Sequence, residues 1–376
     1  MMRLSRAALG AACALTVGLT AYTGMPASAA APAVSSPAVG AVVAKPAATL
    51  AWRDLPTGST ARFRGLAVVS RDVVWAAGYD GTILRTVDGG ATWASVGPAA
   101  AAGLQFRDIE ATSASHAVAM TVGSGEESRI YVTDDGGASW VEADRMADPA
   151  GFYDCMAFTD RSRGVVLSDP VGGVLTLKAT TDGGHTWRSV DTSRAPAPLA
   201  TEYYFAGSGT CLSAGVGGRL AIGTGGADRA RVFLSDDRGA SWSVVDTPVA
   251  ASGSAGIFSV RFMDARRGVI VGGDYLAPDS RDAIAAWTAD GGRTWSLPDV
   301  APGGYRSGAA YAAVGGPNAG VAAIAVGPTG SDMSWDGGRT WRPIDGSSLD
   351  TVQCVAGRCY ASGAGGRVAV LEVGSR

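Results

Sequence analysis

The pattern of apolar and polar positions along the chain predicts many short β-strands. Residues 63–97 hold four of them, "FRGLAVV", "VVWAAGY", "GTILRTV" and "TWASVG", which are continuously apolar or alternate between apolar and polar residues. Glycine, aspartate and serine separate the four runs and are typical of turns. No segment keeps a helical period of apolar residues over about twelve positions. The pattern therefore predicts an all-β protein built from small antiparallel sheets.

An eight-residue box joins the third and fourth strands of this unit, and the chain contains six copies of it. They are "TVDGGATW" (86–93), "TDDGGASW" (133–140), "TTDGGHTW" (180–187), "SDDRGASW" (235–242), "TADGGRTW" (288–295) and "SWDGGRTW" (334–341). The box aspartates lie 47, 47, 55, 53 and 46 residues apart. A period near fifty residues, with four short strands in each repeat, is the signature of a β-propeller blade. We expect the inner strands of the later blades to start near residues 106, 152, 202, 257, 305 and 350.

The seventh repeat is incomplete at its carboxyl end. Residues 350–373 supply three strands but no box and no fourth strand, whereas "LAWRDLP" (50–56) has the pattern of a fourth strand with no blade before it. Pairing these two segments closes the ring and removes two exposed sheet edges. The sequence thus predicts one domain over residues 50–376. Its fold is a seven-bladed β-propeller of four-stranded antiparallel blades, closed by an N-terminal strand in the last blade.

The box residues have the chemistry of a turn. An aspartate accepts hydrogen bonds from the N–H groups that follow it, glycine permits a positive φ, and tryptophan buries a large surface. Six copies on six blades cannot converge on one substrate, so we interpret the box as scaffolding. The residues to which we assign this structural role are Asp88, Trp93, Asp135, Trp140, Asp182, Trp187, Asp237, Trp242, Asp290, Trp295, Asp336 and Trp341.

The box resembles the Asp-box, or bacterial neuraminidase repeat, of sialidases and related propellers. Residues 50–373 also resemble propeller proteins related to the photosystem II stability and assembly factors. That likeness lies in "WRDLP", in "FRGLAVVSRDVVWAAGYDGTILRTVDGGATW" and in the later "DGG-x-TW" units. It implies a propeller with a binding or assembly role, and exported bacterial proteins share it. The sialidase likeness is incomplete, because the Arg-Ile-Pro motif is absent and the equivalent stretch reads "FRGLA".

The start of the chain predicts export. Residues 1–29 combine Arg3 and Arg6, a short apolar run and small residues ending in "ASA", which is the pattern of a secretory signal peptide. Residues 30–49 are rich in alanine, proline, serine and valine and predict a flexible linker. No later segment is apolar for 18 residues. We therefore expect a secreted or extracytoplasmic protein whose mature chain has no transmembrane segment.

Four cysteines follow the signal peptide, and disulfides persist in exported proteins. Cys354 and Cys359 flank a tight hairpin with Gly357 in its turn. Opposed positions in such a hairpin bring two Cβ atoms close enough to bridge, so we predict this disulfide. A Cys155–Cys211 disulfide follows by elimination, with two buried free thiols as the alternative.

The topology of a propeller predicts where a binding site lies. The turns between first and second strands and the boxes share one rim, the box rim. The loops between second and third strands and between blades share the other, the loop rim. Inner strands line the central channel, so polar residues at their starts should surround its mouth. For ligand or partner binding we select Arg64, Arg107, Asp108, Tyr153, Asp169, Asp274 and Arg306, and the candidates for catalysis are Asp154, Glu202 and Tyr203.

The predicted loop lengths favour binding at the loop rim, and the net charge argues against one class of partner. Residues 215–230 and 272–283 are predicted insertions between second and third strands, and long loops on one rim often carry function. The formal net charge of −3 gives no electrostatic case for nucleic acid. We therefore predict a binding or assembly module that engages a protein complex, a peptide or a cell-surface glycan. A closed ring has no free edge strand, so we expect a monomer.

Few catalytic alternatives fit the sequence. Its two histidines, His116 and His185, fall in turns of the box rim, which argues against a Ser-His-Asp triad and a histidine-rich zinc site. No GxGxxG follows a strand and opens a helix, so we predict no dinucleotide, and neither a metal nor another cofactor. The remaining alternative is a glycoside hydrolase or lyase, similar to a sialidase, with paired carboxylates roughly 5–10 Å apart at the channel mouth.

Overall fold

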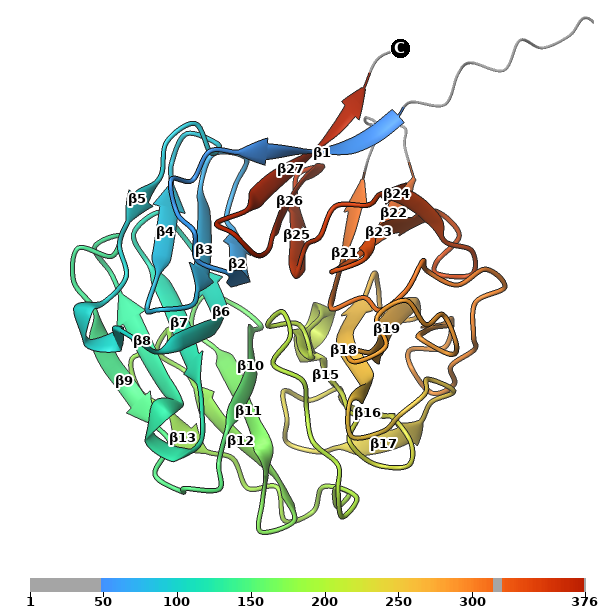
Figure 1. Ribbon diagram of the computed structural model, residues 1–376. Coiled ribbons are helices and arrows are strands. Elements are labelled where there is room, and N and C mark those ends of the chain that lie inside the picture. Colours follow the sequence, from blue (N-terminus) through green and yellow to red (C-terminus); the bar gives the residue numbers. More distant parts are fainter. Residues whose placement is uncertain (1–48, 314–319, 375–376) are drawn as a thin grey trace, which may run out of the picture. The chain divides into compact units, whose positions relative to one another are not determined.

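The computed structural model describes residues 49–313 and 320–374. The described residues form one compact unit, in which seven antiparallel sheets surround a central channel (Figure 1). Six sheets have four strands and one has three, which confirms the predicted all-β, seven-bladed propeller. The predicted signal peptide (1–29) and the predicted linker (30–49), apart from its last residue, lie outside the described residues. Within the described ranges, no helix has the length and apolar character that a membrane crossing needs.

Each blade begins with an inner strand beside the channel. The inner strands are β2 (Phe63–Val68), β6 (Gln105–Ala111), β10 (Tyr153–Phe158), β14 (Leu212–Ala214), β18 (Ala255–Phe262), β21 (Gly308–Ala313) and β25 (Thr351–Val355). The second strands are β3 (Val74–Gly78), β7 (Ala117–Val122), β11 (Gly164–Val171), β15 (Leu220–Gly223), β19 (Gly268–Asp274), β22 (Val321–Gly327) and β26 (Arg358–Ser362). Runs such as "AVAMTV" in β7 are apolar except for Thr121 because the blade is buried on both faces there.

The outer half of each blade completes the sheet. The third strands are β4 (Ile83–Thr86), β8 (Arg129–Thr133), β12 (Val174–Thr180), β16 (Arg231–Ser235), β20 (Ala285–Thr288), β23 (Gly330–Ser334) and β27 (Val368–Gly374). The fourth strands are β5 (Ala94–Ser95), β9 (Val141–Arg145), β13 (Arg188–Ser189), β17 (Ser243–Asp246), β24 (Arg342–Asp345) and β1 (Thr49–Leu55). Three short 3₁₀ turns are η1 (Ala99–Ala101), η2 (Gly125–Glu127) and η3 (Val216–Gly218).

The amino-terminal strand closes the ring as predicted. β1 pairs antiparallel with β27 in the seventh blade, with Trp52 opposite Leu371. Trp52 is buried, and its Nε1–H donates to Ser331 Oγ of the sixth blade at 2.9 Å. The first and last described strands therefore share one sheet (Figure 1).

The fifth blade departs from the predicted four strands. Its sheet contains β18, β19 and β20, and the expected fourth strand is reduced to a single bridge between Trp287 and Ser296. Pro298 follows closely and has no N–H to donate to a strand ladder. The N–H of Asp299 instead donates to the Arg339 carbonyl of the sixth blade at 2.8 Å. The chain therefore leaves the fifth blade early and pairs with its neighbour.

The fourth blade corrects two further expectations. Its inner strand does not start near residue 202, because β14 is Leu212–Ala214. Residues 215–230 are not a loop insertion, since they include η3 and the whole of β15. In the fifth blade, by contrast, residues 275–284 do form a long loop between β19 and β20.

The six boxes have the same pattern of hydrogen bonds. In the second blade, Asp135 Oδ1 accepts from the Thr133 hydroxyl at 2.9 Å and the Ser139 N–H at 2.8 Å, while Oδ2 accepts from the Ser139 hydroxyl at 2.6 Å. These bonds, with the Ser139 hydroxyl first, lower the pKa of Asp135 to about 2. Gly136 and Gly137 adopt positive φ of 78° and 84°. The same acceptor pattern recurs in the other five boxes, so each box carboxylate is engaged within its own turn.

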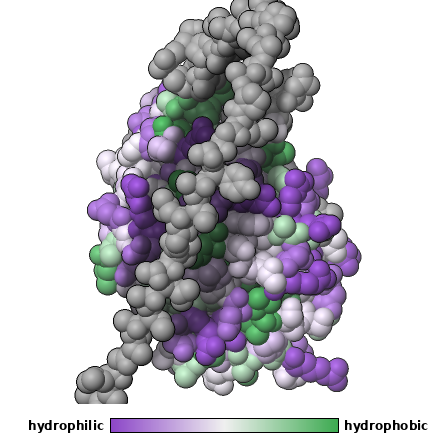
Figure 2. Space-filling view, turned by 90° about the vertical axis from the view of Figure 1, so that its right-hand side faces the viewer, coloured by the Kyte–Doolittle hydropathy of each residue, from purple (hydrophilic) through white to green (hydrophobic). Residues whose placement is uncertain are grey.

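The hydrophobic core is divided among the interfaces between neighbouring blades. Trp75 of β3, for example, lies in one cluster with Phe106 and Ile109 of β6. On the side of the molecule that Figure 2 shows, hydrophobic residues form small groups among hydrophilic ones. Both predicted cysteine pairs lie at disulfide distance. Cys354 and Cys359 have Cα atoms 4.1 Å apart in the β25–β26 hairpin, and those of Cys155 and Cys211 are 5.9 Å apart.

Candidate functional site

Four inner strands carry a β-bulge at corresponding positions near the loop rim. The pairing with the second strand skips Arg64 in β2, Arg107 in β6, Asp154 in β10 and Phe258 in β18. A bulge turns the side chain of its extra residue away from the regular alternation of the sheet. All four of these side chains line one cavity at the channel mouth. The repeated bulge therefore builds this site from four different blades.

The cavity has a volume of about 630 Å³, within the range of roughly 300–1,000 Å³ that is typical of ligand sites. The rest of its lining comes from β11, which carries Asp169, and from loops of the loop rim, among them those with Phe152, Tyr203, Tyr275, Tyr305 and Asp350. We call it the mouth cavity.

Residues 203–210, the mouth segment, cross the channel beneath this cavity. The Ala206 carbonyl accepts from Arg107 at 2.8 Å, and the Ser208 hydroxyl donates to the Ser307 carbonyl at 2.7 Å. The Thr351 hydroxyl donates to the Ser208 carbonyl at 3.0 Å. The partners belong to the second, sixth and seventh blades, so the mouth segment spans the ring and is held from several sides.

Three arginines give one part of the mouth cavity a positive charge. Arg62 forms a bidentate ion pair with Asp350, with both N–O distances at 2.7 Å. Arg107 lies over the Tyr79 ring, and burial together with the positive charge of Arg64 lowers the pKa of Arg107 to about 10. The Nε atoms of Arg64 and Arg107 are both buried without a hydrogen-bond partner among the described residues. The Nη atoms of Arg107 are bonded to Ala206, Tyr79 and Gln105, so Arg64 is the cation of this group with the most capacity left for a ligand.

Two aspartates at the mouth influence each other's protonation. Asp169 Oδ1 accepts the Tyr204 N–H at 3.0 Å, and Asp154 Oδ2 is buried without a hydrogen-bond partner among the described residues. Burial, and then the nearby Asp169, raise the pKa of Asp154 well above its ordinary value. Burial also raises the pKa of Asp169, to about 6. Both carboxyls therefore keep their protons to a higher pH than an exposed aspartate does.

Aromatic rings form another part of the lining. Phe205 and Phe258 stack with centroids 3.9 Å apart, and Tyr305 meets Phe258 edge to face at 4.7 Å. Tyr203 lies 5.2 Å from Phe205, while Tyr275 is 48% exposed. The charged residues come mainly from the first three blades, and the rings from the mouth segment and blades five and six. The mouth cavity thus combines an aromatic wall with an arginine corner.

The structure gives separate surroundings to Glu202 and Tyr203, two of the three predicted catalytic residues. Both carboxylate oxygens of Glu202 bond to the Arg231 guanidinium, and Oε1 also accepts the Thr224 hydroxyl at 2.7 Å. The Glu202 side chain is fully buried, so it does not reach the mouth cavity. Tyr203 lines the cavity with its ring, but its hydroxyl donates to the Gly253 carbonyl.

Four other predicted site residues lie outside the mouth cavity. Arg306 is buried in an ion pair with Asp332, and Asp108 accepts the Met156 N–H at 2.7 Å between two blades. Tyr153 of the third blade donates its hydroxyl to Asp144 of the second blade, and Asp274 accepts the Leu276 N–H of its own loop at 2.9 Å. Each of these side chains is used by the fold.

The remaining predicted residues do meet. Arg64, Arg107, Asp154, Asp169 and Tyr203 all line the mouth cavity. Sequence reasoning missed Phe205, Phe258 and Tyr305. Asp154 and Asp169 are the two aspartates of this set, and both line the cavity near its arginines.

Similarity to known proteins lies in the fold. No protein-family model matches the sequence, and no curated protein matches it. The structure is similar to a solved structure titled "YCF48 bound to D1 peptide", with a TM-score of 0.58 and 16% identity over 87% of this chain and 97% of that one. YCF48 from Cyanidioschyzon merolae gives 0.57 and 17% over 85% and 98%. The WD40 propeller domain of Doa1 gives 0.55 and 12% over 86% and 98%. These matches support the propeller fold alone.

Proposed function

We propose that this protein is a binding module that takes an extended peptide segment of a partner protein into the mouth cavity. The observation that carries the proposal is the bulge-built cavity itself, in which Arg64 adjoins an aromatic wall. A peptide suits both parts, because a carboxylate pairs with a guanidinium and apolar side chains pack on rings. The similarity to a propeller whose structure contains a bound peptide supports the same class of ligand.

The expected ligand has an acidic group flanked by apolar or aromatic residues. Arg62 is occupied by Asp350, and Arg107 by neighbouring protein groups, so Arg64 is the group that meets the acidic group of the ligand. The desolvated cavity strengthens that ion pair relative to the same pair in water. The aromatic wall supplies the apolar contact area.

The test is selection of random ten-residue peptides displayed on phage against the purified protein, followed by affinity measurement for the enriched sequences. Arg64→Gln keeps a polar side chain of similar length and removes the charge. A hydrogen bond to a charged group contributes about 1.5–3 kcal/mol, so we expect Arg64→Gln to weaken binding roughly ten- to hundredfold. Tyr275→Ala should also weaken binding, because its ring is exposed at the cavity.

The matched control is Arg163→Gln on the box rim. Arg163 is an exposed arginine paired with Asp160, so its replacement should leave peptide affinity unchanged. Equal effects of Arg64→Gln and Arg163→Gln would contradict the proposed site. Enrichment of no peptide, together with binding of a glycan on an array, would replace the peptide by a glycan ligand.

We also propose that the protein is exported and that the chain is one of the Asp-box propellers similar to the photosystem II assembly factors. The pattern of residues 1–29 and the two cysteine pairs support export, and the box sequences support the family assignment. Amino-terminal sequencing of protein recovered outside the cytoplasm should find a start near residue 30. Recovery of the uncleaved chain from the cytoplasm alone would contradict export.

A further inference from the structure

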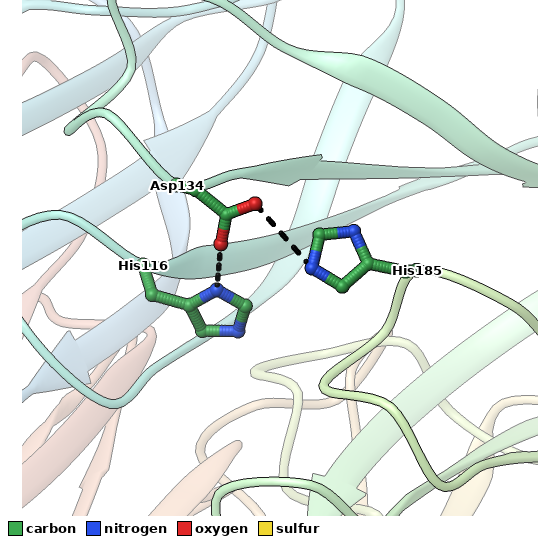
Figure 3. A group of neighbouring side chains, drawn as sticks. All are labelled: His116, Asp134 and His185. Atoms are coloured by element: carbon green, nitrogen blue, oxygen red, sulfur yellow. Dashed lines mark hydrogen bonds and ion pairs between the residues drawn. The ribbon is translucent and has the colours of Figure 1, made fainter.

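Both histidines of the chain converge on one carboxylate at the box rim (Figure 3). His116 Nδ1 lies 2.7 Å from Asp134 Oδ1, and His185 Nε2 lies 3.3 Å from Asp134 Oδ2. The three candidate ligand atoms all lie within 4.8 Å of one another. Two imidazole nitrogens and one carboxylate oxygen thus meet at a single point, although the three residues come from three separate turns.

The turns that carry these residues are fixed by the fold. His116 ends the turn between β6 and β7, where its N–H donates to Ser113 Oγ at 2.8 Å. Asp134 occupies the second position of the box in the second blade. His185 occupies the sixth position of the box in the third blade. The invariant residues of each box bond within the turn, so the variable positions project from a rigid support.

The interface between the fourth and fifth blades has the same three positions with different residues. Arg219 stands in place of His116, Asp236 in place of Asp134, and Arg293 in place of His185. Arg219 Nε pairs with Asp236 at 2.7 Å, and its Nη1 donates to the Ala265 carbonyl of the fifth blade at 2.9 Å. There the position holds an ion pair within the fourth blade and a hydrogen bond from it to the fifth blade. Between the second and third blades, imidazoles replace the guanidinium groups and offer nitrogen lone pairs that arginine lacks.

We propose that His116, Asp134 and His185 bind one Zn²⁺ ion between the second and third blades. Imidazole nitrogen and carboxylate oxygen are both zinc ligands, with bonds of about 2.0–2.2 Å, so tetrahedral donors stand about 3.3 Å apart. The observed separations need only small side-chain rotations to reach that spacing. Three protein ligands leave the fourth position to water. The ion ties adjacent blades together, and the site is independent of the mouth cavity and of the function proposed for it.

The test is titration of the purified protein with Zn²⁺ by isothermal calorimetry, without an added polyhistidine tag. We expect one Zn²⁺ per chain, with Mg²⁺ giving no comparable heat because it prefers oxygen ligands in an octahedral arrangement. The double variant His116→Arg/His185→Arg copies the residues of the other interface, so it preserves an ion pair while removing both nitrogen ligands. Its Zn²⁺ affinity should fall by more than the roughly 10–100-fold that loss of an outer-shell partner costs.

Two further readouts separate a metal site from a merely structural histidine pair. Zn²⁺ should raise the melting temperature of the wild type and leave that of the arginine double variant unchanged, because only the former binds the ion in its folded state. Co²⁺ in place of Zn²⁺ should give the intense visible absorption of a four-coordinate site, and acid should release the ion because imidazole ligates in its neutral form. Absence of Zn²⁺ binding, or equal binding by wild type and the double variant, would overturn the proposal.

Discussion

We expect the replacement of Glu202 by glutamine to lower the stability of the folded protein without removing a catalytic group. The Glu202–Arg231 ion pair has side-chain exposures of 0% and 8%. The glutamate also accepts the Leu199 N–H at 2.8 Å and the Thr224 hydroxyl at 2.7 Å. Glutamine keeps the shape and part of this hydrogen bonding, but it leaves the buried Arg231 charge without a counter-charge.

The magnitude follows from that burial. Removal of one partner from a buried ion pair typically costs about 3–5 kcal/mol. Because Arg231 keeps its bond to the Ala197 carbonyl at 3.1 Å, we expect a loss near the lower end, about 3 kcal/mol. At roughly 2 °C per kcal/mol for a large domain, the melting temperature should fall by about 6 °C. The double variant Glu202→Gln/Arg231→Met should be clearly more stable than the sum of its single variants implies, since it leaves neither charge unpaired.

The assay is thermal and urea denaturation followed by tryptophan fluorescence, using the ten tryptophans of the chain. Glu126→Gln is the matched control, because Glu126 forms a surface ion pair with Arg145 and is 74% exposed. It should leave both midpoints unchanged. A Glu202→Gln variant as stable as the wild type would refute the ion-pair argument and return Glu202 to the catalytic candidates.

Two further predictions concern pH and the disulfides. The raised pKa of Asp169 means that the folded state binds more protons than the unfolded state, so this group makes stability fall as pH rises from about 4 to about 6. Asp169→Asn should make the melting temperature depend less on pH over that range. An unchanged slope of melting temperature against pH would count against the raised pKa of this buried carboxyl. The Cys155–Cys211 disulfide joins residues that are 56 positions apart in the sequence, and the Cys354–Cys359 disulfide joins residues that are 5 apart. In the chain-entropy model, loss of the first lowers the free energy of unfolding by about 4 kcal/mol and loss of the second by about 2 kcal/mol. Paired serine substitutions compared by urea denaturation check this order, and the reverse order would exclude loop entropy as the main term.

The sequence determined the architecture because its determinants are local. The box specifies its own turn through contacts within about five residues, as the bonds of Asp135 to Thr133 and Ser139 show. Counting such turns predicts the number of blades, and an unpaired strand at each end predicts the closure. Arg64, Arg107 and Asp154 were predictable at the mouth for the same reason, since the start of an inner strand sets their position along the channel.

Tertiary structure alone decided the rest of the site. "EYYFAGS" has the composition of a strand, yet residues 203–210 cross the channel, because the rings of Phe205 and Phe258 stack there and Ser208 bonds to two other blades. Strand preference is weak beside such contacts. Glu202 likewise looked available for chemistry until Arg231, 29 residues later in the chain, occupied its carboxylate. Side-chain partners that are distant in sequence leave no local pattern, so the final use of each charged residue depends on how the blades pack.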